Sequence, residues 1–132
     1  MTKLELKIQE KYKTSVEEFV RRALVKYGDK IDEIILFGSV ARREAREDSD
    51  IDILVIGDVS LDELVNISFP ILLEYEKLIS AKNMNKEHFD FLVREGYSFA
   101  STISKEGIIL YEGMGKAFGE SRREAQLSES FI

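Results

Sequence analysis

Two short apolar runs, rich in β-branched residues, constrain most strongly what this 132-residue chain can fold into. Ile31–Phe37 (IDEIILF) and Asp50–Ile56 (DIDILVI) predict two strands that are buried in a sheet. The polar segment 39–48 (SVARREARED) lies between them and is predicted as a short helix or a loop. Amphipathic helical patterns occur before and after the pair, so the sequence predicts an α/β domain in which helices flank a small sheet.

The first helix is predicted from apolar spacing and from signals at its ends. Ser15–Tyr27 carries apolar side chains at helical intervals. Ser15 and Glu18 are expected to form a capping box, and Gly28 is expected to end the helix.

A second helix is predicted after the second strand. It begins with an expected capping box between Ser60 and Glu63, and Pro70 should kink it or split it in two. The later elements are predicted by the same criteria: a strand at 77–84, a helix capped by Asn85, a further helix ending near Gly107 and a strand at 108–112. Residues 113–132 have three glycines and little periodicity, so we expect a domain at 1–112 and a flexible tail at 113–132.

The composition excludes several classes of function. A net charge of −6 argues against non-specific nucleic-acid binding through a broad basic surface. Cysteine is absent and His88 is the single histidine, which excludes disulfides, thiolate metal sites and a His-rich zinc site. No apolar run approaches the roughly 20 residues of a membrane span, and the chain start lacks a signal-peptide core. We therefore expect a cytoplasmic protein without a membrane partner.

Two carboxylates in the second strand are the candidate catalytic and metal-binding residues. Because side chains alternate along a strand, Asp50, Asp52 and Leu54 are expected on one face. The Asp Cα atoms would be about 6–7 Å apart, close enough for the carboxylates to converge on one cation or to bracket two. Oxygen-only ligation indicates Mg²⁺ or Mn²⁺. Their neighbours on the opposite face are expected in the core: Ile51, Ile53 and Val55.

A glycine turn ahead of the aspartates is a candidate anion site. Gly38 permits a tight bend and close approach of a ligand, and Ser39 could cap the helix that follows. Free N–H groups at that helix start would face a phosphate, and Arg42 and Arg43 could neutralise more of its charge. An EF-hand interpretation of DSDID fails, because Ile53 and Val59 occupy the required glycine and glutamate positions.

The spacing Gly38-Ser39, ten residues, then Asp50-x-Asp52 resembles the signature of the nucleotidyltransferase superfamily related to DNA polymerase beta. In particular the chain is similar to the minimal nucleotidyltransferases, the MNT or MntA-like antitoxins of prokaryotes. The resemblance covers about 15–112, including LFGSVARREAREDSDIDILVIGD and KEGIILYE. It implies a polymerase beta-like fold with a small mixed sheet.

The resemblance also implies an activity and a partner. Members of that family transfer AMP from ATP to a hydroxyl, and antitoxins of this kind adenylylate a tyrosine of a partner HEPN toxin, an RNase. By resemblance, Gly38 and Ser39 would bind the nucleotide triphosphate, and Asp50 and Asp52 would bind Mg²⁺ and carry catalysis. Arg42, from its position after the turn, is the candidate for a further contact with the nucleotide.

One departure from the family pattern leaves alternatives open. The superfamily often uses a third carboxylate from a later strand, whereas 77–84 contains no acid; Glu76 precedes that segment and Asp90 lies on a predicted helix. Catalysis could therefore be slow or absent, and the alternative is an antitoxin that neutralises its toxin by binding alone. Transfer to a small molecule is a third option, for which the short chain leaves little room.

Other conspicuous residues have simpler interpretations. The arginines Arg42, Arg43 and Arg46 could either solvate a polar helix or contact nucleotide. His88 and Asp90 are expected at the surface. The nearby aromatic residues are expected in the core or at a dimer contact, and homo-oligomerisation is left open: Phe89, Phe91, Tyr97 and Phe99.

Overall fold

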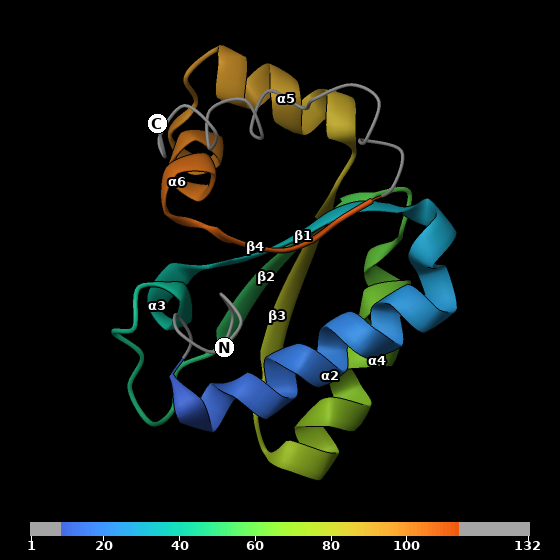
Figure 1. Cartoon of the computed structure of the whole chain (residues 1–132), viewed down its shortest axis with the longest axis vertical. Helices are drawn as coiled ribbons and strands as arrows, with labels where there is room; N and C mark the ends of the chain where they lie inside the picture. The colour runs from blue at the N-terminus through green and yellow to red at the C-terminus, as the bar shows by residue number, and fades with distance from the viewer. Residues whose placement is uncertain (1–8, 114–132) are drawn as a thin grey trace.

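The computed structural model describes residues 9–113, which form a mixed sheet flanked by helices (Figure 1). Within that range the sheet has four strands in the order β3-β2-β1-β4. Strand β1 pairs antiparallel with β2 and β4, and β2 pairs parallel with β3. The strands are β1 Ile31–Phe37, β2 Ile51–Gly57, β3 Ile79–Met84 and β4 Ile108–Glu112. The predicted fold class is confirmed, and each predicted strand is present.

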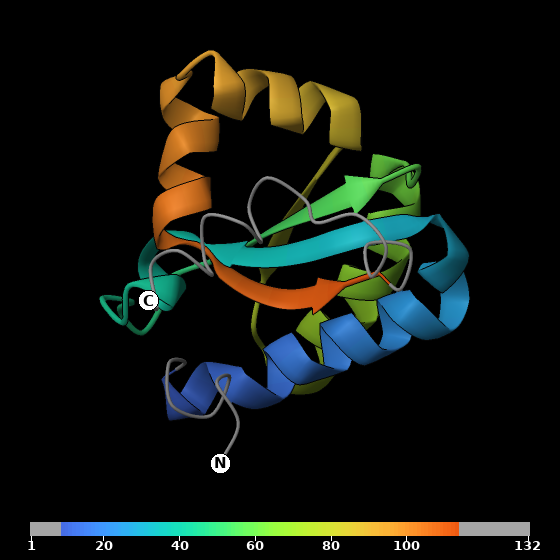
Figure 2. The same ribbon diagram turned by 45° about the horizontal axis from the view of Figure 1, so that its top comes forward.

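Helices cover both faces of this sheet (Figure 2). On one face, α2 and α4 bury the larger core, which includes Ile51, Ile53 and Val55 as predicted. On the other face, α5 and α6 bury a smaller core around Leu54. The helices are α2 Glu10–Tyr27, α3 Gly38–Ala41, α4 Leu61–Tyr75, α5 Lys86–Arg94 and α6 Ser98–Glu106, with a 3₁₀ turn η1 at Gly28–Lys30.

The start of α2 differs from the sequence prediction. The helix begins at Glu10 with Gln9 as its N-cap, so the predicted capping box of Ser15 and Glu18 is wrong. Ser15 is buried inside the helix, and Glu18 instead binds two arginines of the same helix. The apolar face continues one turn further than expected, because Tyr12 is fully buried.

The predicted start of α4 is confirmed. Ser60 Oγ accepts a hydrogen bond of 3.1 Å from the backbone N–H of Glu63, and the Glu63 carboxylate accepts one of 3.0 Å from Ser60 N–H. The helix runs through Pro70 as one element, so the expected alternative of two separate helices is wrong. Ile67 and Ile71 pack into the core on either side of the proline and hold both halves on the sheet.

The later elements also follow the prediction. Asn85 Oδ1 accepts a hydrogen bond of 2.7 Å from His88 N–H and caps α5, and α6 ends immediately before Gly107. Of the predicted tail, 113–132, residues 114–132 lie outside the described residues, so the domain boundary at 112 stays a prediction. Within 9–113, none of the helices is long and apolar enough to cross a bilayer.

Candidate active site

The candidate site lies where β1 ends and the chain turns into α3. Gly38, the first residue of α3, has φ +77°, a conformation that favours glycine. A Cβ at this position would be 2.3 Å from Asp52 Oδ2. Phe37 pairs with Asp52 across the β1–β2 ladder, which holds the carboxylate against the turn. The absence of a side chain at Gly38 therefore makes room for the Asp52 carboxylate.

The two aspartates lie in different environments. Asp50 is exposed just before β2, whereas Asp52 is partly buried within the strand. Burial raises the pKa of Asp52 above its ordinary value, and the nearby Asp50 charge raises it further. The charges of Lys82 and Arg42 act on the same pKa in the opposite direction. A cation bound between the carboxylates would offset both effects that raise the pKa.

These carboxylates fit a hard divalent cation. Both offer only oxygen ligands, as Mg²⁺ and Mn²⁺ prefer, and each remains accessible to solvent. Among residues 9–113, however, the structure contains no group of three His, Asp or Glu side chains placed to hold a metal. Asp50 and Asp52 are thus a two-carboxylate donor set to which a nucleotide or water would have to add further ligands.

Ser39 does not have the capping role predicted for it. The N-cap of α3 is Phe37, without a side-chain capping bond, and Ser39 is the second residue of the helix. The helix begins one residue earlier than expected, at Gly38, so Ser39 lies inside its first turn instead of before it. Ser39 nevertheless lies directly beside Gly38, and its backbone carbonyl accepts a hydrogen bond of 2.8 Å from Glu44 N–H.

Arg42 lies close to the aspartates and is held by a neighbouring acid. Its Nε donates a hydrogen bond of 2.7 Å to Glu44 Oε1, and this bond raises the pKa of Arg42 above its ordinary value. The Asp52 and Glu106 charges contribute in the same direction, so all three acids act on one exposed guanidinium. An anionic ligand at Gly38 could exchange with Glu44 for Arg42.

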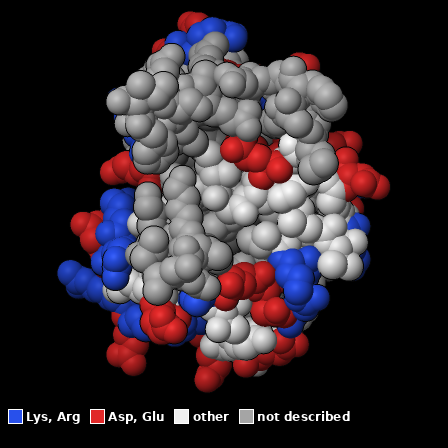
Figure 3. Space-filling view, in the orientation of Figure 1, with Lys and Arg blue, Asp and Glu red and all other residues white. Residues whose placement is uncertain are grey.

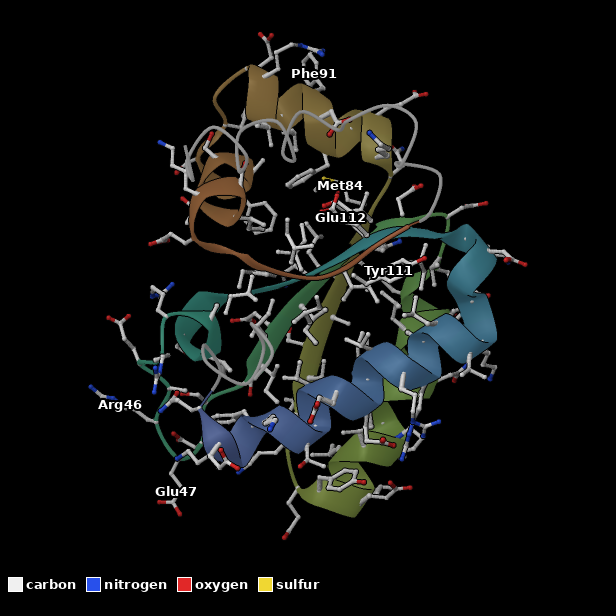
Figure 4. All side chains as sticks on the ribbon, viewed as in Figure 1. Arg46, Glu47, Met84, Phe91, Tyr111 and Glu112 are labelled. Carbon is white, nitrogen blue, oxygen red and sulfur yellow. The ribbon has the colours of Figure 1, made fainter. Side chains whose placement is uncertain are left out.

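The loop after α3 is anchored to α2. Tyr12 Oη donates a hydrogen bond to the backbone carbonyl of Arg46, and Gln9 Oε1 accepts one of 3.2 Å from Ala45 N–H. Figure 4 shows the Arg46 and Glu47 side chains pointing outward from this loop. Figure 3 shows acidic and basic side chains mixed on that side of the molecule rather than a basic patch. The loop is therefore tied to α2 at its base, and its tip is exposed.

The parallel pairing of β2 with β3 shows which residues lie next to Asp52. Ser80 is opposite Asp52 and Lys82 is opposite Leu54, so β3 places no acid beside the candidate metal ligands. Glu76 ends α4 in a left-handed conformation, and Asp90 binds Lys86 at 2.9 Å on α5. The strand predicted at 77–84 is β3, and its residues Ile79–Met84 include no carboxylate that could lie beside Asp52.

Sequence reasoning missed two neighbours of the site. The first is Lys82, which no local sequence pattern singles out, although its charge acts on Asp52 and lowers the pKa of that carboxyl against the larger effect of burial. The alternation of side chains along a strand could have placed it on the Asp52 face if the β2–β3 register had been known. The second is Phe99 of α6, whose ring contacts Phe37 edge-on with centroids 5.8 Å apart. This long-range contact has no local sequence signal.

Comparison with known proteins defines the class of this protein. Residues 9–110 match the nucleotidyltransferase domain family, so the chain belongs to that family and its enzyme class is nucleotidyltransferase, as predicted. Among the similar proteins of Methanocaldococcus jannaschii is "Putative protein adenylyltransferase MJ0604". It is 39% identical over 97 residues, which make up 74% of this chain and 95% of the relative.

Two solved structures share the fold. A chain of a toxin–antitoxin crystal structure with AMP-PNP has a TM-score of 0.55 at 14% identity, covering 87% of this chain and 86% of that one. A chain of a mutant toxin–antitoxin complex, MntA-HpeT, has a TM-score of 0.51 at 14% identity, covering 85% and 83%. At such identity the likeness shows the fold alone, and it agrees with the mixed sheet described above.

Proposed function

We propose that this nucleotidyltransferase transfers AMP from ATP to a hydroxyl of a partner protein. The observation that carries the proposal is the contact of the Asp52 carboxylate with the Gly38 turn, beside Asp50, in a chain of this family. Asp50 and Asp52 are the proposed metal ligands and catalytic residues. Gly38, Ser39 and Arg42, at the turn ahead of the two aspartates, are the proposed contacts of the triphosphate.

The chemistry follows from these placements. The acceptor oxygen attacks the α-phosphorus of ATP, and the bond from that phosphorus to the bridging oxygen of the β-phosphate breaks. Pyrophosphate leaves with the electron pair, and the hydroxyl proton passes to water. Asp50 and Asp52 would hold Mg²⁺, which when bound supplies Lewis-acid polarisation of the α-phosphate. Arg42 would neutralise charge on the leaving pyrophosphate, for which it must release Glu44.

The proposed acceptor is a tyrosine hydroxyl of a HEPN-type toxin, with this chain as its antitoxin in the cytoplasm. Support comes from the protein adenylyltransferase name of the relative and from the toxin–antitoxin complexes that share the fold.

Mass spectrometry tests the proposal. A candidate HEPN-type toxin is incubated with the enzyme, Mg²⁺ and ATP, and its intact mass should increase by one or more AMP units. Asp52→Asn should slow labelling at least ~100-fold, because it removes a proposed metal ligand. Asp58→Asn is the matched control, an exposed acid just beyond the other end of β2, and should label within about twofold of wild type. Unchanged labelling by Asp52→Asn would refute the assignment.

A second candidate function is neutralisation by binding alone. The observation that favours it is the absence of a third acid on β3 beside Asp52. A variant with both Asp50→Asn and Asp52→Asn would then still inhibit the toxin at a stoichiometric ratio without nucleotide. Loss of inhibition in that variant, with binding to the toxin retained, favours the enzymatic function.

A further inference from the structure

Lys82 lies on the face of the sheet that carries Asp52. In the parallel β2–β3 pairing, Ser80 is opposite Asp52 and Lys82 is opposite Leu54, two residues further along. Residues two apart on a strand share a face, so Lys82 projects from the same side of the sheet as the proposed metal ligand. Its side chain is exposed, whereas the Leu54 side chain beside it is buried under α5 and α6.

The strand geometry brings the ammonium within reach of a ligand at the site. Adjacent strands lie about 4.8 Å apart and two residues advance about 6.6 Å, so the Cα atoms of Lys82 and Asp52 are about 8 Å apart. The flexible four-carbon stem of lysine can span much of that distance. The charge already acts on Asp52, whose pKa it draws downward against the larger effect of burial.

β3 carries the Lys82 ammonium, and no carboxylate, on the face next to Asp52. An acid on β3 beside Asp52 would help to hold a second divalent ion, whereas an ammonium there repels one. The same ammonium attracts a phosphate oxygen. Arg42 follows α3 at the end of β1 and already binds Glu44. Lys82 is a second positive charge, and it faces the site from β3 on the other side of β2.

We propose that Lys82 binds a phosphate oxygen of the nucleotide and supplies, at the β3 side of the site, the positive charge that a second divalent ion would otherwise supply. The enzyme would then bind one divalent ion with each nucleotide. This inference rests on the proposed nucleotide site at Gly38 and Asp52 and adds a residue to it. Lys82 becomes a contact that sets nucleotide affinity and metal number.

Binding of Mg-ATP, measured by calorimetry without any acceptor, tests the contact. Lys82→Ala should raise the Kd for Mg-ATP about tenfold or more, and Lys82→Arg should restore most of the affinity because it keeps the charge. Lys26→Ala is the matched control, an exposed lysine near the C-terminal end of α2, and should leave the Kd within about twofold. A Kd for Lys82→Ala within twofold of wild type would overturn the proposal.

Lys82 could also act only through its charge on Asp52, without touching the nucleotide. Measuring Mn²⁺ binding in the absence of nucleotide distinguishes that effect from a direct contact with phosphate. If Lys82 only competed with a cation for Asp52, Lys82→Ala would tighten Mn²⁺ binding and would also tighten nucleotide binding. The proposal instead expects weaker nucleotide binding whatever happens to free Mn²⁺. Tighter binding of both ligands would overturn it.

The metal count provides a second readout. With a non-hydrolysable ATP analogue, titration followed by Mn²⁺ electron paramagnetic resonance should give one ion per bound nucleotide in the wild type. The double variant Ser80→Asp/Lys82→Ala places an acid opposite Asp52 and removes the ammonium, and should give two. Two ions in the wild type would refute the inference alone, whereas failure of the wild type to bind Mg-ATP would refute the proposed function as well.

Discussion

At the scale of single residues, the site depends on a contact that only glycine permits. Gly38 has a positive φ and faces the Asp52 carboxylate, which leaves no room for a methyl group. The sequence predicted the turn and the pair of aspartates, because both are local patterns. It could not show that the carboxylate touches the turn, since that contact depends on the pairing of Phe37 with Asp52 across two strands.

Gly38→Ala should therefore disable the site beyond its cost to folding. The positive φ alone costs about 1–2 kcal/mol for alanine, and the added Cβ must displace Asp52 Oδ2 from 2.3 Å. Gly96→Ala is a matched control, because Gly96 has φ +78° with nothing within 4 Å of an added Cβ. Thermal denaturation should show similar losses for both, whereas Mg-ATP affinity should fall at least ~10-fold only for Gly38→Ala. Equal affinities in the two variants would contradict the role given to this contact.

At the scale of secondary-structure elements, local patterns predicted the strands and most helix ends. The runs that form β1 and β2 are buried on both faces, and their β-branched residues showed this in the sequence. The caps at Ser60 and Asn85 were predictable because side chain and backbone partner are three residues apart. The start of α2 was not, since its first turn is fixed by Tyr12, which bonds to the distant loop at Arg46.

A cluster of charges on α2 makes a prediction about acid stability. Glu18 binds Arg21 and Arg22, whose hydrogen bonds lower its pKa to about 2, and Arg22 also binds Glu74 of α4. A carboxyl with a depressed pKa adds stability above its ordinary value of 4.5, and this is lost as the pH falls towards 2. Glu18→Gln should therefore be less stable than wild type at pH 6, and the difference should shrink between pH 4.5 and 2.

Urea denaturation at several pH values measures this difference. The effect should be modest, because exposed ion pairs contribute little and are screened by salt. Glu17→Gln, an exposed neighbour on the same helix, is the control for the loss of one negative charge. A stability difference for Glu18→Gln that stayed constant from pH 6 to pH 2 would show that packing of the side chain, rather than its charge, is responsible.

At the scale of the whole molecule, the site lies at the edge of the smaller of two cores. The sequence placed Leu54 on the face of Asp52 and the alternating residues in the core, but Leu54 is itself buried under α5 and α6. Helix α6 reaches the site through the Phe99 ring on Phe37 and through the Glu106 charge near Arg42. These contacts join residues about sixty positions apart, so no window of the sequence contained them.

This arrangement predicts that a cavity in the smaller core weakens nucleotide binding at the site more than a cavity in the larger core. Ile103 of α6 and Ile71 of α4 are both buried, the first in the smaller core and the second in the larger. Replacing either with alanine should cost about 2–5 kcal/mol of unfolding free energy, measured by urea denaturation. Only Ile103→Ala loosens the helix that packs on Phe37, the residue paired with Asp52.

Mg-ATP affinity, measured at a temperature at which both variants are fully folded, should therefore fall several-fold for Ile103→Ala and stay close to wild type for Ile71→Ala. The comparison separates a local effect on the site from general loss of stability, because the substitution is the same in both and the expected cost to folding is similar. Equal losses of affinity would mean that the site depends on the stability of the whole sheet. The contact of α6 with the end of β1 would then have no separate part in holding Asp52 in place.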